Sequence, residues 1–177
     1  MWTDDAERVL APDYLGDVTS RPIADIRTMR AECRNVEDKV SYLRRLVQGR
    51  LDIVSADLRR RAEGGSPGDL ASLVDRLAEI LSDSGHASGP GRLPQSVLPP
   101  DDDDLTVELD AVAPAGALDA LEDLSDAEVT DLAERLGAFE RQVSDRRRAL
   151  FGRIDALGAE LTRRYKSGEA NVGSVLG

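Results

Sequence analysis

The sequence predicts an all-α protein whose core is a two-helix antiparallel coiled-coil hairpin, with a shorter amphipathic helix and a flexible acidic connection. Aromatic residues make up only 3% of the 177 residues and charged residues make up 32%, a balance typical of long helices rather than of β-sandwiches. Two long stretches of the chain also repeat apolar residues at alternating steps of three and four, which is the spacing of a coiled-coil seam.

The first element is an arm over residues 1–20, in which Pro12 and Gly16 limit any helix to a short piece near residues 4–10. The first long helix is predicted at residues 21–63. It starts near Pro22, because proline is tolerated in the first turn of a helix, and it stops at two consecutive glycines. Its apolar seam consists of Ile26, Met29, Cys33, Val36, Val40, Leu43, Val47, Leu51, Val54 and Leu58.

The middle of the chain, residues 64–124, has a mixed composition. Apolar residues at helical spacing predict a short amphipathic helix over residues 67–82. A stretch rich in glycine, serine and proline follows, and the aspartate run at residues 101–104 prolongs it into an acidic linker. Residues 106–109 suggest a short extended segment, and residues 117–124 suggest one or two helical turns.

The second long helix is predicted at residues 125–167, followed by a tail over residues 168–177. Ser125 and Glu128 have the spacing of a capping box, in which each side chain binds the backbone amide of the other residue. The seam lies 103 residues after the first seam, so the two helices form an internal repeat in register. Its members are Val129, Leu132, Leu136, Phe139, Val143, Leu150, Ile154, Leu157 and Leu161.

The net charge of −11 comes from residues 64–125, which carry 13 acidic and two basic side chains, whereas the flanking parts are balanced. This acidic excess would repel nucleic-acid backbones, so we expect no direct DNA binding, and a basic protein surface is the better partner. The single cysteine, Cys33, and the single histidine, His86, argue against a disulfide or a metal site. The absence of a long apolar run or a basic leader predicts a cytoplasmic protein that contacts no membrane. We also expect the protein to be monomeric on its own.

A stripe of polar side chains runs beside the seam of each helix, and in the first helix every member lies one residue after a seam position. At about 100° per residue the stripe is roughly 80° wide. Four of its five residue types recur 103 residues later. We call these ten residues the polar stripe: Glu37, Ser41, Arg44, Gln48 and Asp52 on the first helix, and Glu140, Ser144, Arg147, Phe151 and Asp155 on the second.

Residues that flank a coiled-coil seam commonly form solvated ion pairs worth about 0.3 to 0.5 kcal/mol. A simple ion-pair seam has no need of serine at one fixed position on both helices, so the repeat favours ligand recognition. Arginine offers a planar fork of donors for phosphate, and carboxylates accept from the ring N–H and amine of guanine. The stripe contains no activated nucleophile and no glycine-rich phosphate cradle, which predicts a purine-nucleotide site rather than an enzyme.

The dimensions of the stripe narrow the ligand further. From Glu37 to Asp52 the stripe extends over roughly 22 Å along the helix axis, more than one mononucleotide occupies. In an antiparallel hairpin the two copies face each other about a pseudo-twofold axis. A twofold-symmetric, doubly phosphorylated guanine ligand would match this arrangement.

The spacing Glu-x3-Ser-x2-Arg-x3-Gln-x3-Asp resembles the cyclic di-GMP motif of the actinobacterial RsiG-type anti-sigma factors. The first copy matches at all five positions, and the second departs at Phe151, where the family pattern has glutamine. The resemblance implies an antiparallel coiled coil that binds a dimer of cyclic di-GMP as a regulatory ligand, two molecules per chain. It also implies that the loaded protein sequesters the sigma factor WhiG and delays sporulation genes. The alternative is a structural coiled-coil adaptor whose stripe only fixes helix pairing.

Overall fold

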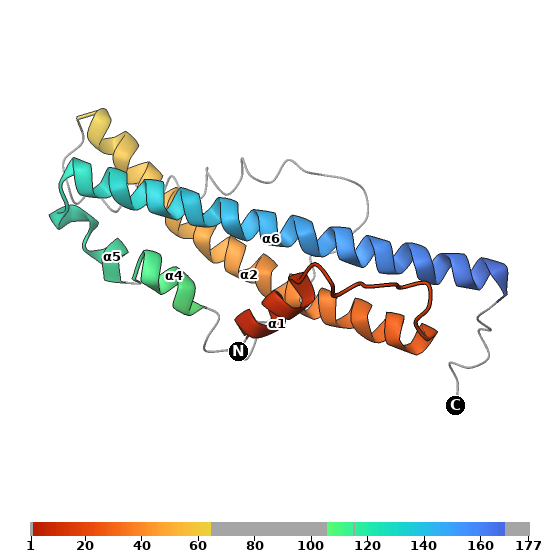
Figure 1. Ribbon diagram of the computed structural model, residues 1–177. Coiled ribbons are helices and arrows are strands. Elements are labelled where there is room, and N and C mark those ends of the chain that lie inside the picture. The colour runs from red at the N-terminus through yellow and green to blue at the C-terminus, as the bar shows by residue number, and fades with distance from the viewer. Residues whose placement is uncertain (1, 65–105, 115, 169–177) are drawn as a thin grey trace. The chain divides into compact units, whose positions relative to one another are not determined.

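The computed structural model describes residues 2–64, 106–114 and 116–168. Every regular element in these ranges is helical, which confirms the all-α prediction (Figure 1). The predicted helix at 67–82 and the aspartate run at 101–104 lie outside the described residues. The elements are α1 (Trp2–Leu10), α2 (Ile23–Ala62), α4 (Val107–Val112), α5 (Gly116–Asp119), the 3-10 helix η2 (Leu121–Asp123) and α6 (Asp126–Ser167).

The predicted helix boundaries are largely confirmed. Helix α2 ends before Gly64, whose φ of 77° is the left-handed conformation that glycine adopts without strain. Helix α6 starts with the predicted capping box, in which the Ser125 amide donates to Glu128 Oε2 at 2.8 Å and the Glu128 amide donates to Ser125 Oγ at 3.4 Å. The short helix in the arm and the turns after residue 116 are also present.

The prediction of an extended segment at residues 106–109 is wrong, because these residues begin α4. The alternation of Val107 and Leu109 fits a strand, but residues 107–112 form a helix in which Leu109 is buried and Val107 is exposed. The acidic side chains of Glu108 and Asp110 also lie in the first turn, where the helix dipole favours them.

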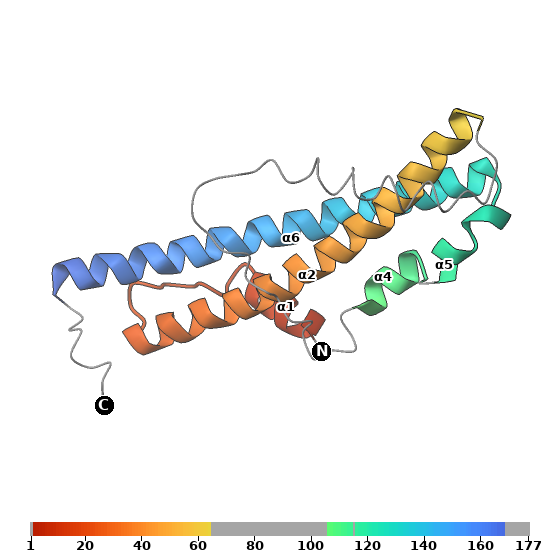
Figure 2. The same ribbon diagram turned by 180° about the vertical axis from the view of Figure 1, so that it is seen from behind.

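The chain divides into two compact units. Among the described residues, unit 1 contains 2–44 and 141–168, and unit 2 contains 45–64, 106–114 and 116–140. Helices α2 and α6, which Figure 2 shows from behind, each contribute one part to each unit.

In both units α2 and α6 pack against each other in antiparallel orientation. In unit 1 the Arg27 guanidinium hydrogen-bonds the Tyr165 hydroxyl, and Arg44 bonds Ser144, so rising numbers in α2 meet falling numbers in α6. Within unit 2, Gln48 contacts Glu140 and Arg61 contacts Asp126, so there too rising numbers in α2 meet falling numbers in α6. These pairings confirm the predicted antiparallel packing of the two long helices.

The predicted seam forms the core of both units. Every seam residue is buried except Leu51 and Leu58, which are half-buried. Full burial of one aliphatic side chain stabilises the fold by about 1.5 to 3 kcal/mol, so this row of side chains is the main source of stability. The arm and α4 add further buried residues, namely Ala6, Val9, Leu109 and Ala113.

Arginines of the long helices bind the backbone of the shorter segments. In unit 1 Arg153 of α6 donates to the carbonyls of Leu10 and Ala11, the latter at 3.0 Å, where α1 ends. In unit 2 Arg50 of α2 donates to the carbonyl of Ala113, where α4 ends. Both contacts satisfy carbonyls that a helix end leaves without an intrahelical partner.

A second pair of arginines binds the turns that precede the long helices. Arg164 donates to the carbonyls of Val18 and Arg21 at 2.9 and 2.6 Å in unit 1. Arg61 donates to the carbonyls of Leu121 and Leu124 at 2.6 and 2.7 Å in unit 2. Each donor and each acceptor lies 103 residues from its counterpart, as Arg50 and Arg153 do, so the internal repeat includes the arm and the α4–η2 segment as well as the long helices.

Candidate functional site

The centre of the polar stripe is a pair of reciprocal hydrogen bonds in unit 1. The Nε of Arg44 on α2 donates to Ser144 Oγ on α6 at 2.8 Å. The Nε of Arg147 on α6 donates to Ser41 Oγ on α2, also at 2.8 Å. Each arginine therefore reaches the serine of the other copy, which is the relation that a local twofold axis between the copies produces.

Glu37 joins this cluster from the preceding turn of α2. Its Oε1 accepts from Arg147 Nε at 3.0 Å and from Ser41 Oγ at 2.6 Å. The Glu37 side chain is 13% exposed, whereas that of Arg147 is 36% exposed. The carboxylate thus holds the arginine from the protein side, and part of the guanidinium faces solvent.

Phe151 in the second copy stands at the position where the first copy has Gln48. The guanidinium carbon of Arg147 lies 4.7 Å from the centre of the Phe151 ring, which is a cation–π contact. Because the ring is 39% exposed, it offers an aromatic face beside the arginine rather than filling the core.

The remaining stripe residues are more loosely arranged. In unit 2 Gln48 Nε2 lies 3.5 Å from Glu140 Oε1, a long hydrogen bond. Asp52 in unit 2 and Asp155 in unit 1 are exposed carboxylates at the outer end of each copy. The two helices therefore bring stripe residues into contact within each unit, with the tightest contacts at Ser41, Arg44, Ser144 and Arg147.

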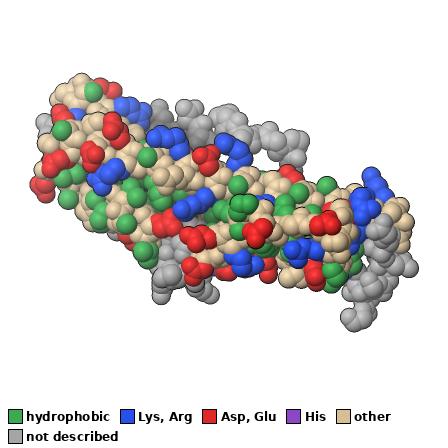
Figure 3. Space-filling view, viewed as in Figure 1, with side chains coloured by type: hydrophobic (Ala, Val, Ile, Leu, Met, Phe, Trp, Pro, Cys, Tyr) green, Lys and Arg blue, Asp and Glu red, His purple; other side chains and the backbone are tan. Residues whose placement is uncertain are grey.

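The described surface is of mixed charge. On the face shown in Figure 3, acidic and basic side chains are interspersed among hydrophobic ones. Next to Glu37, the pKa of the Asp38 carboxyl is raised by partial burial and by the neighbouring Glu37 charge. In the described ranges, no cluster of three or more histidine, cysteine or acidic side chains could hold a metal ion. None of the helices described is both long enough and apolar enough to cross a membrane.

Sequence reasoning missed the arginines that bind backbone carbonyls. Arg50 and Arg153 lie outside the polar stripe, as do Arg61 and Arg164, and a backbone carbonyl has no sequence signature. A signal was nevertheless present, because each of these arginines recurs at the offset of 103 residues that relates the seams.

Comparison with curated proteins finds no significant match. The family model described as RsiG-like matches residues 12–81 and 115–176, two segments that include all of α2 and α6 and every residue of the polar stripe. This match extends over most of the sequence. The chain therefore belongs to the RsiG-like family.

Proposed function

We propose that the chain is an anti-sigma factor that binds cyclic di-GMP along the polar stripe and, when loaded, sequesters a sporulation sigma factor of the WhiG type. Membership in the RsiG-like family suggests the anti-sigma role and a regulatory rather than an enzymatic protein. Binding of cyclic di-GMP is supported by the reciprocal pairing of Arg44 with Ser144 and of Arg147 with Ser41, since this pairing suits a ligand with twofold symmetry.

The stripe offers suitable groups for such a ligand. Arg147 forms its hydrogen bonds to Ser41 and Glu37 through Nε, and these two bonds fix the orientation of the guanidinium. A guanidinium oriented in this way can bind phosphate through two parallel hydrogen bonds or stack on a purine. The exposed carboxylates of Asp52 and Asp155 can accept from the N1–H and amine of guanine.

The second candidate function is a structural coiled-coil adaptor without a nucleotide. It is favoured by the fact that several stripe residues bond one another directly, as Arg147 and Glu37 do at 3.0 Å. In this function the serines and arginines would only set the register of the two helices.

Isothermal titration of the full chain with cyclic di-GMP separates the two functions. The proposed function predicts saturation at two nucleotides per chain and no binding of GMP at the same concentrations, because one GMP can engage only one end of the stripe. An adaptor would release no heat with either nucleotide. Saturation at one cyclic di-GMP would contradict a bound nucleotide dimer, and nucleotide breakdown during long incubation would contradict a purely regulatory role.

A further inference from the structure

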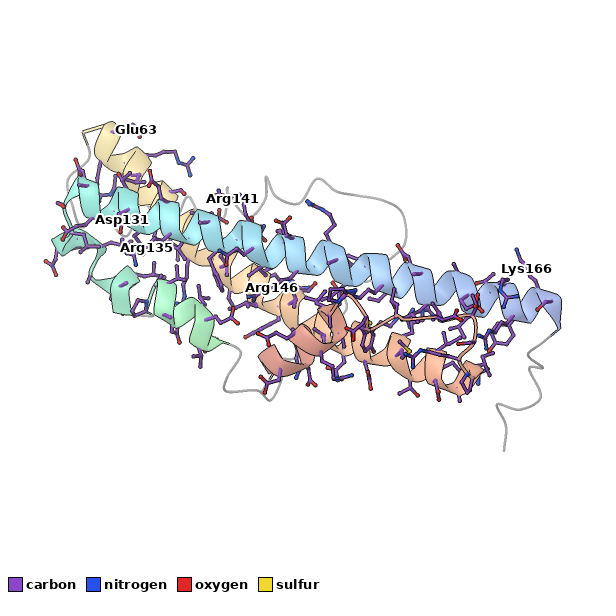
Figure 4. All side chains as sticks on the ribbon, viewed as in Figure 1. Glu63, Asp131, Arg135, Arg141, Arg146 and Lys166 are labelled. Atoms are coloured by element: carbon purple, nitrogen blue, oxygen red, sulfur yellow. The ribbon has the colours of Figure 1, made fainter. Side chains whose placement is uncertain are left out.

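Unit 2 contains a groove that the proposed nucleotide site does not use. Its volume is about 470 Å³, and it lies between the α4–α5 segment and the first turns of α6. Apolar side chains form most of its walls, with Val112 and Ala117 on one side and Leu124 and Leu132 on the other. Figure 4 shows Asp131 and Arg135 on the side of α6 that faces α4 and α5, and both residues line this groove.

The internal repeat indicates what the groove is shaped to hold. The residue 103 positions before Ala117 is Tyr14, and in unit 1 this tyrosine is half-buried between the arm and α2. Its hydroxyl donates to Glu32 at 2.8 Å and lies 3.3 Å from the Met29 carbonyl. Met29 and Glu32 correspond to Leu132 and Arg135, which line the groove in unit 2. The groove is therefore lined by the counterparts of Tyr14 and of the two residues that its hydroxyl contacts, with alanine in place of the tyrosine.

The polar end of the groove has also changed between the copies. In unit 1 the carboxylate of Glu32 accepts a hydrogen bond from the tyrosine hydroxyl and pairs with Arg8 at 2.9 Å. In unit 2 the corresponding Arg135 can only donate, and it binds Asp131 and the Val112 carbonyl, both at 2.9 Å. Its side chain is 51% exposed. An occupant that reaches Arg135 must therefore present an acceptor, and a tyrosine hydroxyl can serve as one.

We propose that this groove is a docking site for a tyrosine side chain of a partner protein. The ring takes the place that Tyr14 occupies in unit 1 and packs on Leu124 and Leu132. The hydroxyl oxygen accepts from the guanidinium of Arg135. A single aromatic side chain seated in an apolar groove with one directed polar contact is the common form of an interface anchor.

The first experiment uses N-acetyl-tyrosine amide as the probe and follows the backbone amides of the full chain by nuclear magnetic resonance. At millimolar probe we expect saturable shifts confined to the groove, including those of Leu132 and Arg135. N-acetyl-alanine amide, which lacks the ring, should cause none. Shifts that are absent, or that spread evenly over the surface, would overturn the proposal.

Two variants test the occupant directly. Ala117→Tyr supplies the missing ring within the chain, so it should abolish probe binding and raise the thermal midpoint of unfolding. Ala149→Tyr adds the same ring at an exposed position of α6 and should leave probe binding unchanged. Probe binding that persists in a folded Ala117→Tyr variant would overturn the proposal.

Arg135→Ala tests the acceptor contact and removes only an exposed side chain. It should weaken binding of N-acetyl-tyrosine amide about threefold and leave N-acetyl-phenylalanine amide unaffected, because only the former has a hydroxyl. Equal loss for both probes would contradict the role of Arg135. None of these measurements uses cyclic di-GMP or a sigma factor, so their outcome is independent of the proposed function.

Discussion

Arg147 Nε lies 2.8 Å from Ser41 Oγ, and these two residues belong to different copies of the internal repeat. The counterpart contact between Arg44 and Ser144 has the same length. Because each arginine reaches the serine of the other copy, we infer that neither copy of the polar stripe acts alone. Both copies should contribute to whatever binds there.

Arg44→Ala and Arg147→Ala are each expected to weaken cyclic di-GMP binding tenfold or more, since a charge-assisted hydrogen bond contributes about 1.5 to 3 kcal/mol. Helicity should be retained, because both side chains lie beside the seam. Calorimetric titration and circular dichroism measure the two effects. Arg148→Ala, which removes an arginine that is 81% exposed on the same helix, is the matched control and should bind normally. Normal binding by both stripe variants would place the site elsewhere.

Phe151→Ala should also weaken nucleotide binding, because the exposed ring beside Arg147 provides a face on which a guanine can stack. Stacking on an aromatic side chain contributes about 1 to 3 kcal/mol per base, so a loss of at least fivefold is expected. The same titration provides the measurement. If Phe151→Ala bound the nucleotide as tightly as the wild type, guanine would not stack on this ring. Its contact with Arg147 would then be its only role.

Cyclic di-GMP and the sigma factor are expected to bind with positive coupling. The stripe is half-exposed along two helices, so a bound nucleotide would form part of the surface that a protein partner meets. Reciprocity then requires each ligand to raise the affinity for the other by the same factor, about tenfold for a typical coupling. Surface-bound chain can capture a WhiG-type sigma factor with and without nucleotide at fixed ionic strength. Equal capture in both would mean that the nucleotide is not a switch.

Arg164→Ala should destabilise the fold by about 3 kcal/mol or more. The Arg164 side chain is 9% exposed, pairs with Glu160 at 2.7 Å and donates to carbonyls of the arm, so its loss removes several charge-assisted hydrogen bonds at once. Urea unfolding measures the change. Arg163 is the other partner of Glu160, and the Arg163 side chain is 49% exposed. Arg163→Ala should therefore cost less than about 1 kcal/mol. Similar losses in both variants would contradict the role of the carbonyl contacts.

The contribution of Glu160 to stability should disappear in acid. Hydrogen bonds from Arg163 and Arg164 lower the pKa of Glu160 from 4.5 to about 2 in the folded protein. A lowered pKa means that the folded state favours the charged carboxylate. The stabilisation is therefore complete above about pH 4.5 and is lost as the pH falls towards 2.

Thermal unfolding of Glu160→Gln across this range provides the test. The difference in midpoint from the wild type should be largest near neutral pH and should shrink below pH 4.5. Asp145→Asn, which breaks an ion pair whose side chains are 71% and 81% exposed, should have little effect throughout. A difference for Glu160→Gln that stays constant down to pH 2 would contradict the assigned pKa.

The core could be predicted from the sequence because the spacing of apolar residues alone defines a coiled-coil seam. The error at Val107 has a physical origin, since two alternating apolar residues fit a strand and a single helical turn equally well. The burial of Leu109 in unit 2 decides between the two, and the local sequence does not show this burial.

The residues of the polar stripe could also be identified from the sequence, but the hydrogen bonds among them could not. The offset of 103 residues relates Arg44 to Arg147 and Ser41 to Ser144, yet it does not say which arginine reaches which serine. That choice depends on the register between α2 and α6, which many seam residues set together. Whether these residues bind a nucleotide stays a prediction.

Two copies that reside on one polypeptide can diverge in a way that two identical subunits cannot. In a symmetric homodimer, a change from tyrosine to alanine or from glutamine to phenylalanine would appear on both sides at once. Here Tyr14 corresponds to Ala117 in the other copy, and Gln48 corresponds to Phe151. A duplicated chain can therefore keep the symmetric contacts at its centre while it presents unlike ends to an asymmetric binding partner.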